Sequence, residues 1–196
     1  VISEKYLRFF DLNPTKCEKI PEVFIFFFGN SIFSKSNLEN NWNNLELIDL
    51  KIDQDIEIIS SFYEINQQQV PKVGSVSLEE FIDLIKISDI SYGIMKKGIC
   101  LGFVICLREN TKYQSINYKF FQKRHKSFFY IDRIAIESKS QSSGIGSILY
   151  KKLLSFKENI NIPICAEVNI DPPNDLSIYF HKKLSLIHIS EPTRPL

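Results

Sequence analysis

Apolar and polar residues alternate with a period of two at 45–52 (L-E-L-I-D-L-K-I), which predicts a first strand. After Asp53 or Asp55, either of which can cap a helix, the apolar residues recur with a helical period. Ser77 is a good N-cap for a second helix, because Glu80 stands at the position that completes a capping box. The pattern therefore begins with a strand followed by two helices.

The pattern next predicts a hairpin, because two apolar runs at 90–95 and 99–107 flank the turn sequence Lys96-Lys97-Gly98. The polar and aromatic stretch at 108–126 has room for a short helix. The remaining elements are, in chain order, a strand at 127–137, a helix at 144–158, a strand at 162–170 and a helix at 174–184. The order β-α-α-β-β-β-α-β-α predicts an α/β fold, with a mixed α+β sheet and helices on both faces.

The two ends of the chain lie outside this pattern. Residues 1–43 contain V-F-I-F-F-F at 23–28, which fits either a strand or a short buried helix, so we treat the segment as an N-terminal appendage of unknown status. Residues 44–184 form one domain, the default for a chain of 196 residues. Residues 185–196 look like translated sequencing-adaptor read-through, so we expect a non-native tail there.

Composition limits the classes of partner. The hydrophobic share is 44%, and 24 basic residues nearly balance 23 acidic ones, which leaves a net charge of +1. This charge gives no reason to expect a nucleic acid or an anionic membrane as partner. The longest apolar run, at 23–28, is far shorter than the roughly 20 residues of a spanning helix, and no signal peptide is visible. We therefore expect a cytoplasmic protein.

The four cysteines carry no evident chemistry. They form no C-x-x-C pair, and with only three histidines the sequence has no zinc-type spacing. Isolated cysteines within apolar runs are most often buried thiols. We expect no metal site, and no covalent cysteine intermediate, because Cys165 has no evident base partner.

A strand–turn–helix segment carries the strongest functional signal. Residues 130–150 read Y-I-D-R-I-A-I-E-S-K-S-Q-S-S-G-I-G-S-I-L-Y, an apolar strand, a Ser-rich turn and a helix start. The first amides of a helix have no partner within it, and the helix dipole adds partial positive charge there. Gly144 and Gly146 would let a phosphate approach those amides closely. An ordinary glycine-containing connection is the alternative.

Two motifs stand at fixed places in this element order: Q-S-S-G-I-G at 141–146 and N-D-L-S-I-Y-F-H-K-K-L at 174–184. Together with the element order they resemble the pyrophosphate loop and last-helix pattern of the GNAT superfamily of acyl-CoA-dependent N-acyltransferases. F-Y-I-D-R-I-A-I and A-E-V-N-I-D-P-P-N resemble a small subgroup of predicted acetyltransferases. The resemblance implies a GNAT-like fold that two further strands complete. The chain departs from the pattern after Leu184, so we expect a C-terminal truncation, the absence of those strands and an exposed sheet edge.

The resemblance implies an acetyl-CoA-dependent N-acetyltransferase that moves an acetyl group directly to a primary amine. The co-substrate would be acetyl-CoA, no metal would be needed, and the acceptor would be a small-molecule or peptide amine. Neither a nucleic acid nor a membrane is expected as partner, and a homodimer is left open. The alternative is a non-catalytic acyl-CoA-binding module, which would keep the phosphate-binding turn without an acid or a base.

The resemblance also assigns residues to the acyl-CoA site. The pyrophosphate cradle is expected at the turn and the helix start, at Gln141, Ser142, Ser143, Gly144, Ile145 and Gly146. A bulge in the preceding strand is expected to turn backbone groups toward the pantetheine arm, at Ile134, Ala135 and Ile136. The last helix is expected to contribute Asn174 and Ser177, with helix capping as the alternative role of Asn174.

The catalytic residues are expected on several elements. His181 stands where most relatives have the Tyr that protonates the leaving thiolate, and an ordinary pKa of about 6.5 suits that role; a surface histidine is the alternative. The base would be Asp132, Glu137 or Glu167, and a site with no single base is the alternative. A structural ion pair with Arg133 is the alternative for Asp132. Five aromatic residues either line the acceptor pocket or belong to the core: Tyr113, Tyr118, Phe121, Phe128 and Tyr130.

Overall fold

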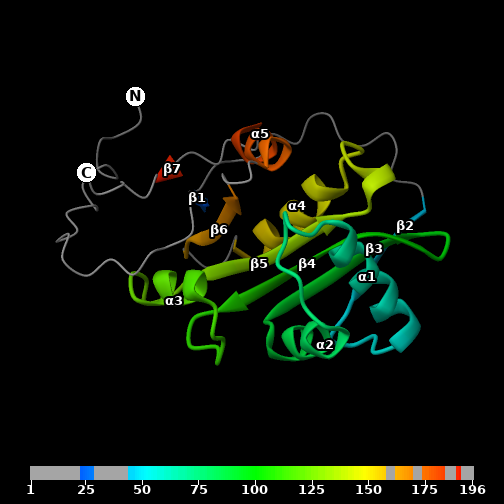
Figure 1. Cartoon of the computed structure of the whole chain (residues 1–196), viewed down its shortest axis with the longest axis horizontal. Helices are drawn as coiled ribbons and strands as arrows, with labels where there is room; N and C mark the ends of the chain where they lie inside the picture. Colours follow the sequence, from blue (N-terminus) through cyan, green and yellow to red (C-terminus); the bar gives the residue numbers. More distant parts are fainter. Residues whose placement is uncertain (1–22, 29–43, 158–161, 170–173, 184–188, 191–196) are drawn as a thin grey trace.

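Within the residues that the structure describes, seven strands form one sheet with helices on both of its faces (Figure 1). The computed structural model describes residues 23–28, 44–157, 162–169, 174–183 and 189–190. The strands are β1 (Val23–Phe28), β2 (Leu45–Asp49), β3 (Ile90–Lys96), β4 (Ile99–Arg108), β5 (Phe129–Ile136), β6 (Ile164–Asn169) and β7 (Ile189–Ser190). The helices are α1 (Ile56–Gln68), α2 (Leu78–Ile87), α3 (Ile116–Gln122), α4 (Ile145–Lys157) and α5 (Asp175–Lys183), with a 3₁₀ turn, η3 (Ser138–Ser140), between β5 and α4.

The strands lie in the order β2-β3-β4-β5-β6-β1-β7. β2 to β5 are consecutive antiparallel neighbours, whereas β6 joins β5 in parallel after the crossover through α4. This mixed sheet confirms the predicted class of fold and the predicted order of elements from β2 to α5. The helix α3 occupies the polar and aromatic stretch at 108–126, which had room for a short helix.

Side-chain caps fix the starts of α1 and α2. The Asp55 carboxylate accepts the backbone N–H of Glu57 at 2.8 Å, so Asp55, and not Asp53, caps α1. Ser77 and Glu80 form the predicted capping box of α2. Each cap satisfies amides that the first helical turn leaves without a partner.

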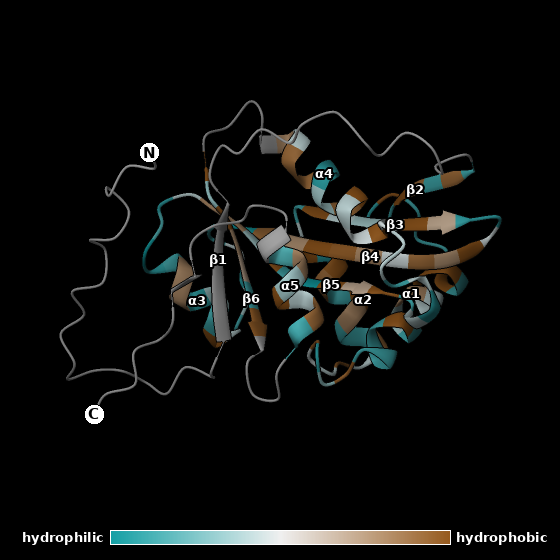
Figure 2. Ribbon diagram, turned by 90° about the horizontal axis from the view of Figure 1, so that it is seen from above, coloured by the Kyte–Doolittle hydropathy of each residue, from teal (hydrophilic) through white to brown (hydrophobic). Residues whose placement is uncertain are grey.

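The sheet separates two hydrophobic cores, because alternate residues of a strand point to opposite faces. On one face α1, α2 and α3 pack over Phe103, Ile105 and Leu107 of β4. On the other face α4 and α5 cover Val104 and Cys106 of the same strand. Figure 2 shows β4 apolar along most of its length, as expected for a strand that is buried on both faces.

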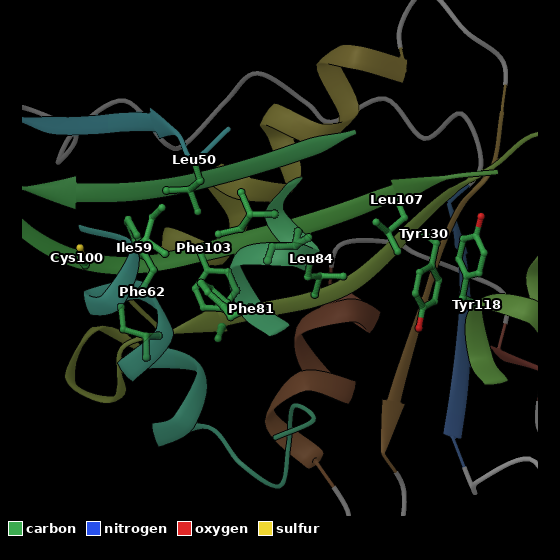
Figure 3. Close-up of a cluster of buried hydrophobic side chains, with 14 of the residues drawn as sticks. Leu50, Ile59, Phe62, Phe81, Leu84, Cys100, Phe103, Leu107, Tyr118 and Tyr130 are labelled. Carbon is green, nitrogen blue, oxygen red and sulfur yellow. The ribbon is translucent and has the colours of Figure 1, made fainter. Parts of the chain in front are cut away.

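Aromatic rings pack among aliphatic side chains in the core under α1, α2 and α3 (Figure 3). Phe81 and Phe103 meet edge to face with centroids 5.1 Å apart, and Phe62 lies 6.2 Å from Phe103. At the other end of this core, Tyr118 of α3 and Tyr130 of β5 pack with centroids 5.6 Å apart. The second pair fixes α3 against the strand that carries the candidate site.

β1 lies beyond β6 and pairs with it antiparallel, from Val23 opposite Asn169 to Phe28 opposite Ile164. The segment 23–28 is therefore a strand, which decides between the two structures that its sequence fits. Within the described residues β1 pairs along β6, so the exposed edge that we expected does not lie at β6, while the absence of two closing strands stays a prediction. The status of the rest of 1–43, and of the tail at 185–196 apart from β7, stays a prediction because those residues lie outside the described ones.

The described part of the chain carries little evidence of other site types. Cys100, Cys106 and Cys165 are buried and form no disulfide within the described residues, as predicted, while Cys17 lies outside those residues. Among the described residues no group of three His, Cys, Asp or Glu side chains is placed to hold a metal ion. No helix in the same segments is long and apolar enough to cross a membrane.

Candidate active site

β5 carries a bulge at Asp132. The register between β4 and β5 shifts there, because Ile105 pairs with Arg133 whereas its neighbour Cys106 pairs with Ile131. Asp132 is thereby left without a partner residue on β4. A bulge of this kind bends the strand and changes the direction of the side chains around it.

The bulge lies two residues before the segment in which we expected it. Ile134, Ala135 and Ile136 keep regular pairing with β4. Ala135 is buried in the core under α1 and α2, and the two isoleucines pack toward α4 and α5. The expected irregularity is therefore present in β5, but the residues that we assigned to it belong to a regular strand.

β5 and β6 separate next to the bulge. Their parallel pairing is limited to Phe129 with Ile164 and Tyr130 with Cys165, and the described residues after these are not matched. A side-chain contact bridges the opening, in which the Tyr130 hydroxyl donates to Glu167 Oε1 at 2.6 Å. The bulge and the separation place Asp132 and Glu167 near one opening in the middle of the sheet.

Glu167 is a buried carboxyl with one saturated and one unsatisfied oxygen. Oε1 accepts from Tyr130 and also from Asn117 Nδ2, at 2.7 Å. Oε2 is shielded from solvent and has no hydrogen-bond partner among the described residues. Burial raises the pKa of Glu167 to about 7, against the effect of its two hydrogen bonds and with a smaller contribution from the charge of Asp132. A carboxyl that titrates near neutrality suits a general base.

Asp132 and Glu137 are placed less well for that role. Asp132 Oδ2 accepts from Arg133 Nε at 2.8 Å, with the two side chains only 4% and 6% exposed, which is the structural ion pair considered as its alternative. Arg133 Nη1 also donates to Asn66 Oδ1 of α1 at 3.0 Å. Glu137 lies in the turn after β5, where the backbone N–H of Lys139 lowers its pKa.

The Ser- and Gly-containing turn before α4 has an unusual backbone. Ser142 and Gly144 have positive φ values of 60° and 95°. The first amides of α4 therefore follow directly on a sharp turn, and Ile148 N–H donates to Gly144 O at 3.2 Å. The amides before Ile148 have no acceptor within the helix, as at any helix start. Such a group of amides is able to bind a phosphate.

Side chains hold the turn in place from both ends. Gln141 Nε2 donates to Gln69 Oε1 at the end of α1 at 3.0 Å, and Gln69 Nε2 donates to Ser138 Oγ at 3.1 Å. The Ser143 hydroxyl donates to Ser140 O at 2.5 Å. The side chains of Gln141 and Ser143 thus stabilise the turn itself, which leaves its backbone amides as the groups suited to bind an anion.

The helix start also packs against α5. Ile145 is 5% exposed and belongs to the core under α4. A Cβ added at Gly146 would lie 3.2 Å from Phe180 Cζ, so the absence of a side chain there lets α4 approach α5. Gly144 is needed for its positive φ, and Gly146 for close packing.

His181 is buried, with only 2% of its surface exposed, so it is not a surface histidine. Its Nδ1 lies 2.7 Å from Ser177 O, a carbonyl that can only accept, so the ring proton is on Nδ1. The Tyr150 hydroxyl then donates to Nε2 at 2.5 Å. Burial lowers the pKa of His181 to about 4. The lowered pKa disfavours the imidazolium form that a proton donor would use, and the donor role expected for His181 stays a prediction.

Asn174 caps α5, since its Oδ1 accepts the backbone N–H of Ser177 at 3.3 Å. The Ser177 hydroxyl lies 3.3 Å from His181 Nδ1. Both side chains that we assigned to the pantetheine arm thus have partners within α5. The capping role considered for Asn174 is the one that the geometry gives.

The aromatic residues of the region belong mainly to the core. Four of them are no more than 1% exposed: Tyr118, Phe121, Phe128 and Tyr130. Tyr113 is partly buried and packs on Tyr118 with centroids 5.8 Å apart. Tyr113 is therefore the one of the five with surface left to contact a ligand.

Three polar residues of the site were not predicted from the sequence: Asn66, Asn117 and Tyr150. Each acts through a partner far away in the chain, at Arg133, Glu167 and His181 respectively. None shares a helical or strand period with its partner. Only the fold brings these pairs together.

Comparisons with known proteins point to one family and fold. The sequence model of the acetyltransferase (GNAT) family matches residues 59–185. The structure is similar to the aminoglycoside N-acetyltransferase AAC(6')-Iy in complex with CoA, with 12% identity, a TM-score of 0.57, and coverage of 81% of this chain and 98% of that one. It is also similar to Ard1 from Thermoplasma volcanium (20% identity, TM-score 0.54, coverage 72% and 81%). A further neighbour is the NatC complex bound to Gag peptide and CoA, with 13% identity, a TM-score of 0.54, and coverage of 72% of this chain and 83% of that one. A search of curated proteins gave no match.

Proposed function

Because this chain belongs to the GNAT acetyltransferase family, we propose that it transfers the acetyl group of acetyl-CoA directly to a primary amine, with Glu167 as general base. The observation that carries the proposal is the Glu167 carboxyl, buried where β5 and β6 separate and with a pKa raised to about 7. An amine must be neutral to attack a thioester, so the site needs a group that accepts its proton near neutral pH.

The acetyl-CoA would lie between the turn before α4 and the opening between β5 and β6. Its pyrophosphate would bind the backbone amides of Ser142 to Gly146, supported by the positive end of the α4 dipole. The irregular backbone at Asp132 leaves main-chain groups outside the β4–β5 ladder, where they can contact the pantetheine arm. Asn174 and Ser177 would act there by fixing the start of α5.

The proton balance of the proposed reaction needs no imidazolium. Glu167 first takes one proton from the ammonium; the neutral amine nitrogen then bonds to the acetyl carbon, the carbon–sulfur bond breaks, and the second nitrogen proton goes to water. A thiol of ordinary pKa, about 8.5, can leave as a thiolate and take its proton from water. His181, neutral and bonded to Tyr150 and Ser177, would hold α5 against α4.

The acceptor proposed is a small-molecule or peptide amine. Support comes from two structural neighbours, an aminoglycoside N-acetyltransferase and a complex bound to a peptide and CoA. At 12% and 13% identity the similarity to these two neighbours concerns the fold alone. We therefore assign neither an aminoglycoside nor a particular peptide as the acceptor of this chain.

One observation favours a second candidate, a non-catalytic acyl-CoA-binding module. His181 stands at the position from which relatives protonate the leaving group, and here its ring is neutral and buried. A module of this kind would keep the turn before α4 and lack turnover with every amine.

The test is release of free coenzyme A thiol from acetyl-CoA in the presence of a panel of amines, including a peptide with a free N-terminus, a polyamine and an aminoglycoside. We expect turnover with at least one amine, and a loss of at least about tenfold in kcat/KM for Glu167→Gln. The control is Glu64→Gln, on the exposed side of α1. Unchanged turnover in Glu167→Gln would remove Glu167 as base, and binding of acetyl-CoA without any turnover would favour the module.

A further inference from the structure

Two hydrogen-bond acceptors that belong to neighbouring residues of the site have no donor. Glu167 Oε2 and Asn117 Oδ1 are both shielded from solvent, and neither has a partner among the described residues. The two residues are in direct contact, because Asn117 Nδ2 donates to Glu167 Oε1 at 2.7 Å. A buried acceptor without a donor destabilises the folded protein, so two of them in contacting residues indicate that a donor is missing.

The neighbouring contacts fix the orientation of both groups. An ionised carboxylate only accepts, so the amide of Asn117 must point its nitrogen at Glu167 and keep Oδ1 for another donor. Tyr130 adds a second donor to Oε1, at 2.6 Å, and so leaves Oε2 as the oxygen to be satisfied. Asn117 lies in the first turn of α3, which Ser115 caps and Tyr118 anchors in the aromatic core. The pair is therefore held in place before any ligand binds.

The charge around this pair favours a cation. Asp132 is close enough to Glu167 to act on its charge, yet its own carboxylate is paired with Arg133. Within the described part of the chain no salt bridge involves Glu167. The missing donor should therefore present N–H groups. It should also carry a positive charge or a proton that it can lose.

We propose that Glu167 Oε2 and Asn117 Oδ1 together bind the nitrogen of the amine acceptor, and that Asn117 is the residue that selects acceptors with at least two N–H donors. This inference rests on the proposed function and names the recognition step of the same site. A primary ammonium has three N–H groups, so it can donate to both oxygens, whereas an alcohol has a single donor and a quaternary ammonium has none. Transfer of one ammonium proton to Oε2 then leaves the neutral amine that attack requires.

The experiment measures binding without acetyl transfer. The Glu167 carboxyl is followed by ¹³C NMR titration, and its signal is assigned by its absence in Glu167→Gln. The probes are n-butylammonium and butyltrimethylammonium at equal concentration and ionic strength, which share charge and chain but differ in N–H groups. An opposite charge in contact lowers a carboxyl pKa by about 1–3, so n-butylammonium should lower the titration midpoint by at least about one pH unit. Butyltrimethylammonium should produce less than half of that change.

Asn117→Leu tests the second acceptor, because leucine keeps the size of the side chain and removes its polar atoms. We expect this variant to respond equally to the two probes, while Gln122→Leu, an exposed position at the end of α3, keeps the difference. Equal responses in the wild-type protein, or an unchanged difference in Asn117→Leu, would overturn the proposal. If Asn117→Leu does not fold, the comparison of the two probes on the wild-type protein decides alone.

The outcome is separable from that of the acetyl-transfer assay. Discrimination between the two probes without acetyl transfer would refute the proposed function and support the amine-binding pair. Acetyl transfer without discrimination would support the function and refute the pair.

Discussion

Replacing Glu167 with Gln should remove a pH dependence of stability whose size follows from the burial of this carboxyl. The folded state raises the pKa of Glu167 from 4.5 to about 7. Because the folded state holds the proton more tightly than the unfolded state, the resulting stabilisation is present below pH 4.5 and is lost as the pH rises through about 7. A pKa difference of about 2.5 corresponds to roughly 3 kcal/mol, at about 1.36 kcal/mol per pKa unit.

The assay is urea unfolding followed by circular dichroism at several pH values between 5 and 8. Over this interval the wild-type protein should lose about 2.5 kcal/mol more than Glu167→Gln. Gln keeps an acceptor for Tyr130 and Asn117 but places an N–H group at the position of Oε2, which adds an offset of about 1–3 kcal/mol that does not vary with pH. The exposed control Glu64→Gln should keep the wild-type dependence. Parallel profiles for wild type and Glu167→Gln would refute the reasoning, since Glu167 would then titrate alike in both states.

Two further predictions concern α5 and the turn before α4. The pKa of His181 is lowered from 6.5 to about 4, so the stability that its neutral ring contributes is present above pH 6.5 and is lost as the pH falls through about 4. This loss of roughly 3 kcal/mol should be absent in His181→Gln, measured by urea unfolding from pH 7 to pH 4; equal acid sensitivity of both proteins would contradict it. Gly144→Asp should weaken coenzyme A binding at least about tenfold in calorimetry, because Asp adds strain at a φ of 95° and negative charge at the helix start. Gly74→Asp, where a Cβ meets nothing within 4 Å, is its control, and an unchanged affinity in Gly144→Asp would remove the turn from the site.

Local signals in the sequence were sufficient to predict most helices and strands of the fold. The capping box of Ser77 and Glu80 involves only neighbouring residues, and it forms as predicted. The hairpin turn also forms as predicted, with positive φ at Lys97 and Gly98. Asp53 and Asp55 were equally good candidates for the N-cap of α1 by local sequence. Only the structure shows that Asp55 is the cap.

The site was predictable only in outline, because its chemistry depends on contacts between distant elements. Glu167 was one of three carboxylates with equal standing until burial and the hydrogen bond from Asn117 set it apart. His181 was expected to be a proton donor because its sequence position says nothing of burial beside Tyr150. The bulge at Asp132 is a matter of register between β4 and β5, which a single strand does not encode.

The position of β1 in the sheet has a consequence for how the chain is made. β1 comes early in the chain, yet its hydrogen-bonding partner β6 comes near the end, after every helix except α5. During synthesis the segment V-F-I-F-F-F at 23–28 therefore emerges long before β6 exists. An uncharged segment without proline and with this strand preference is prone to aggregate while it is unpaired. The first strand of the nascent chain therefore stays without its β6 partner until the last long strand has been made.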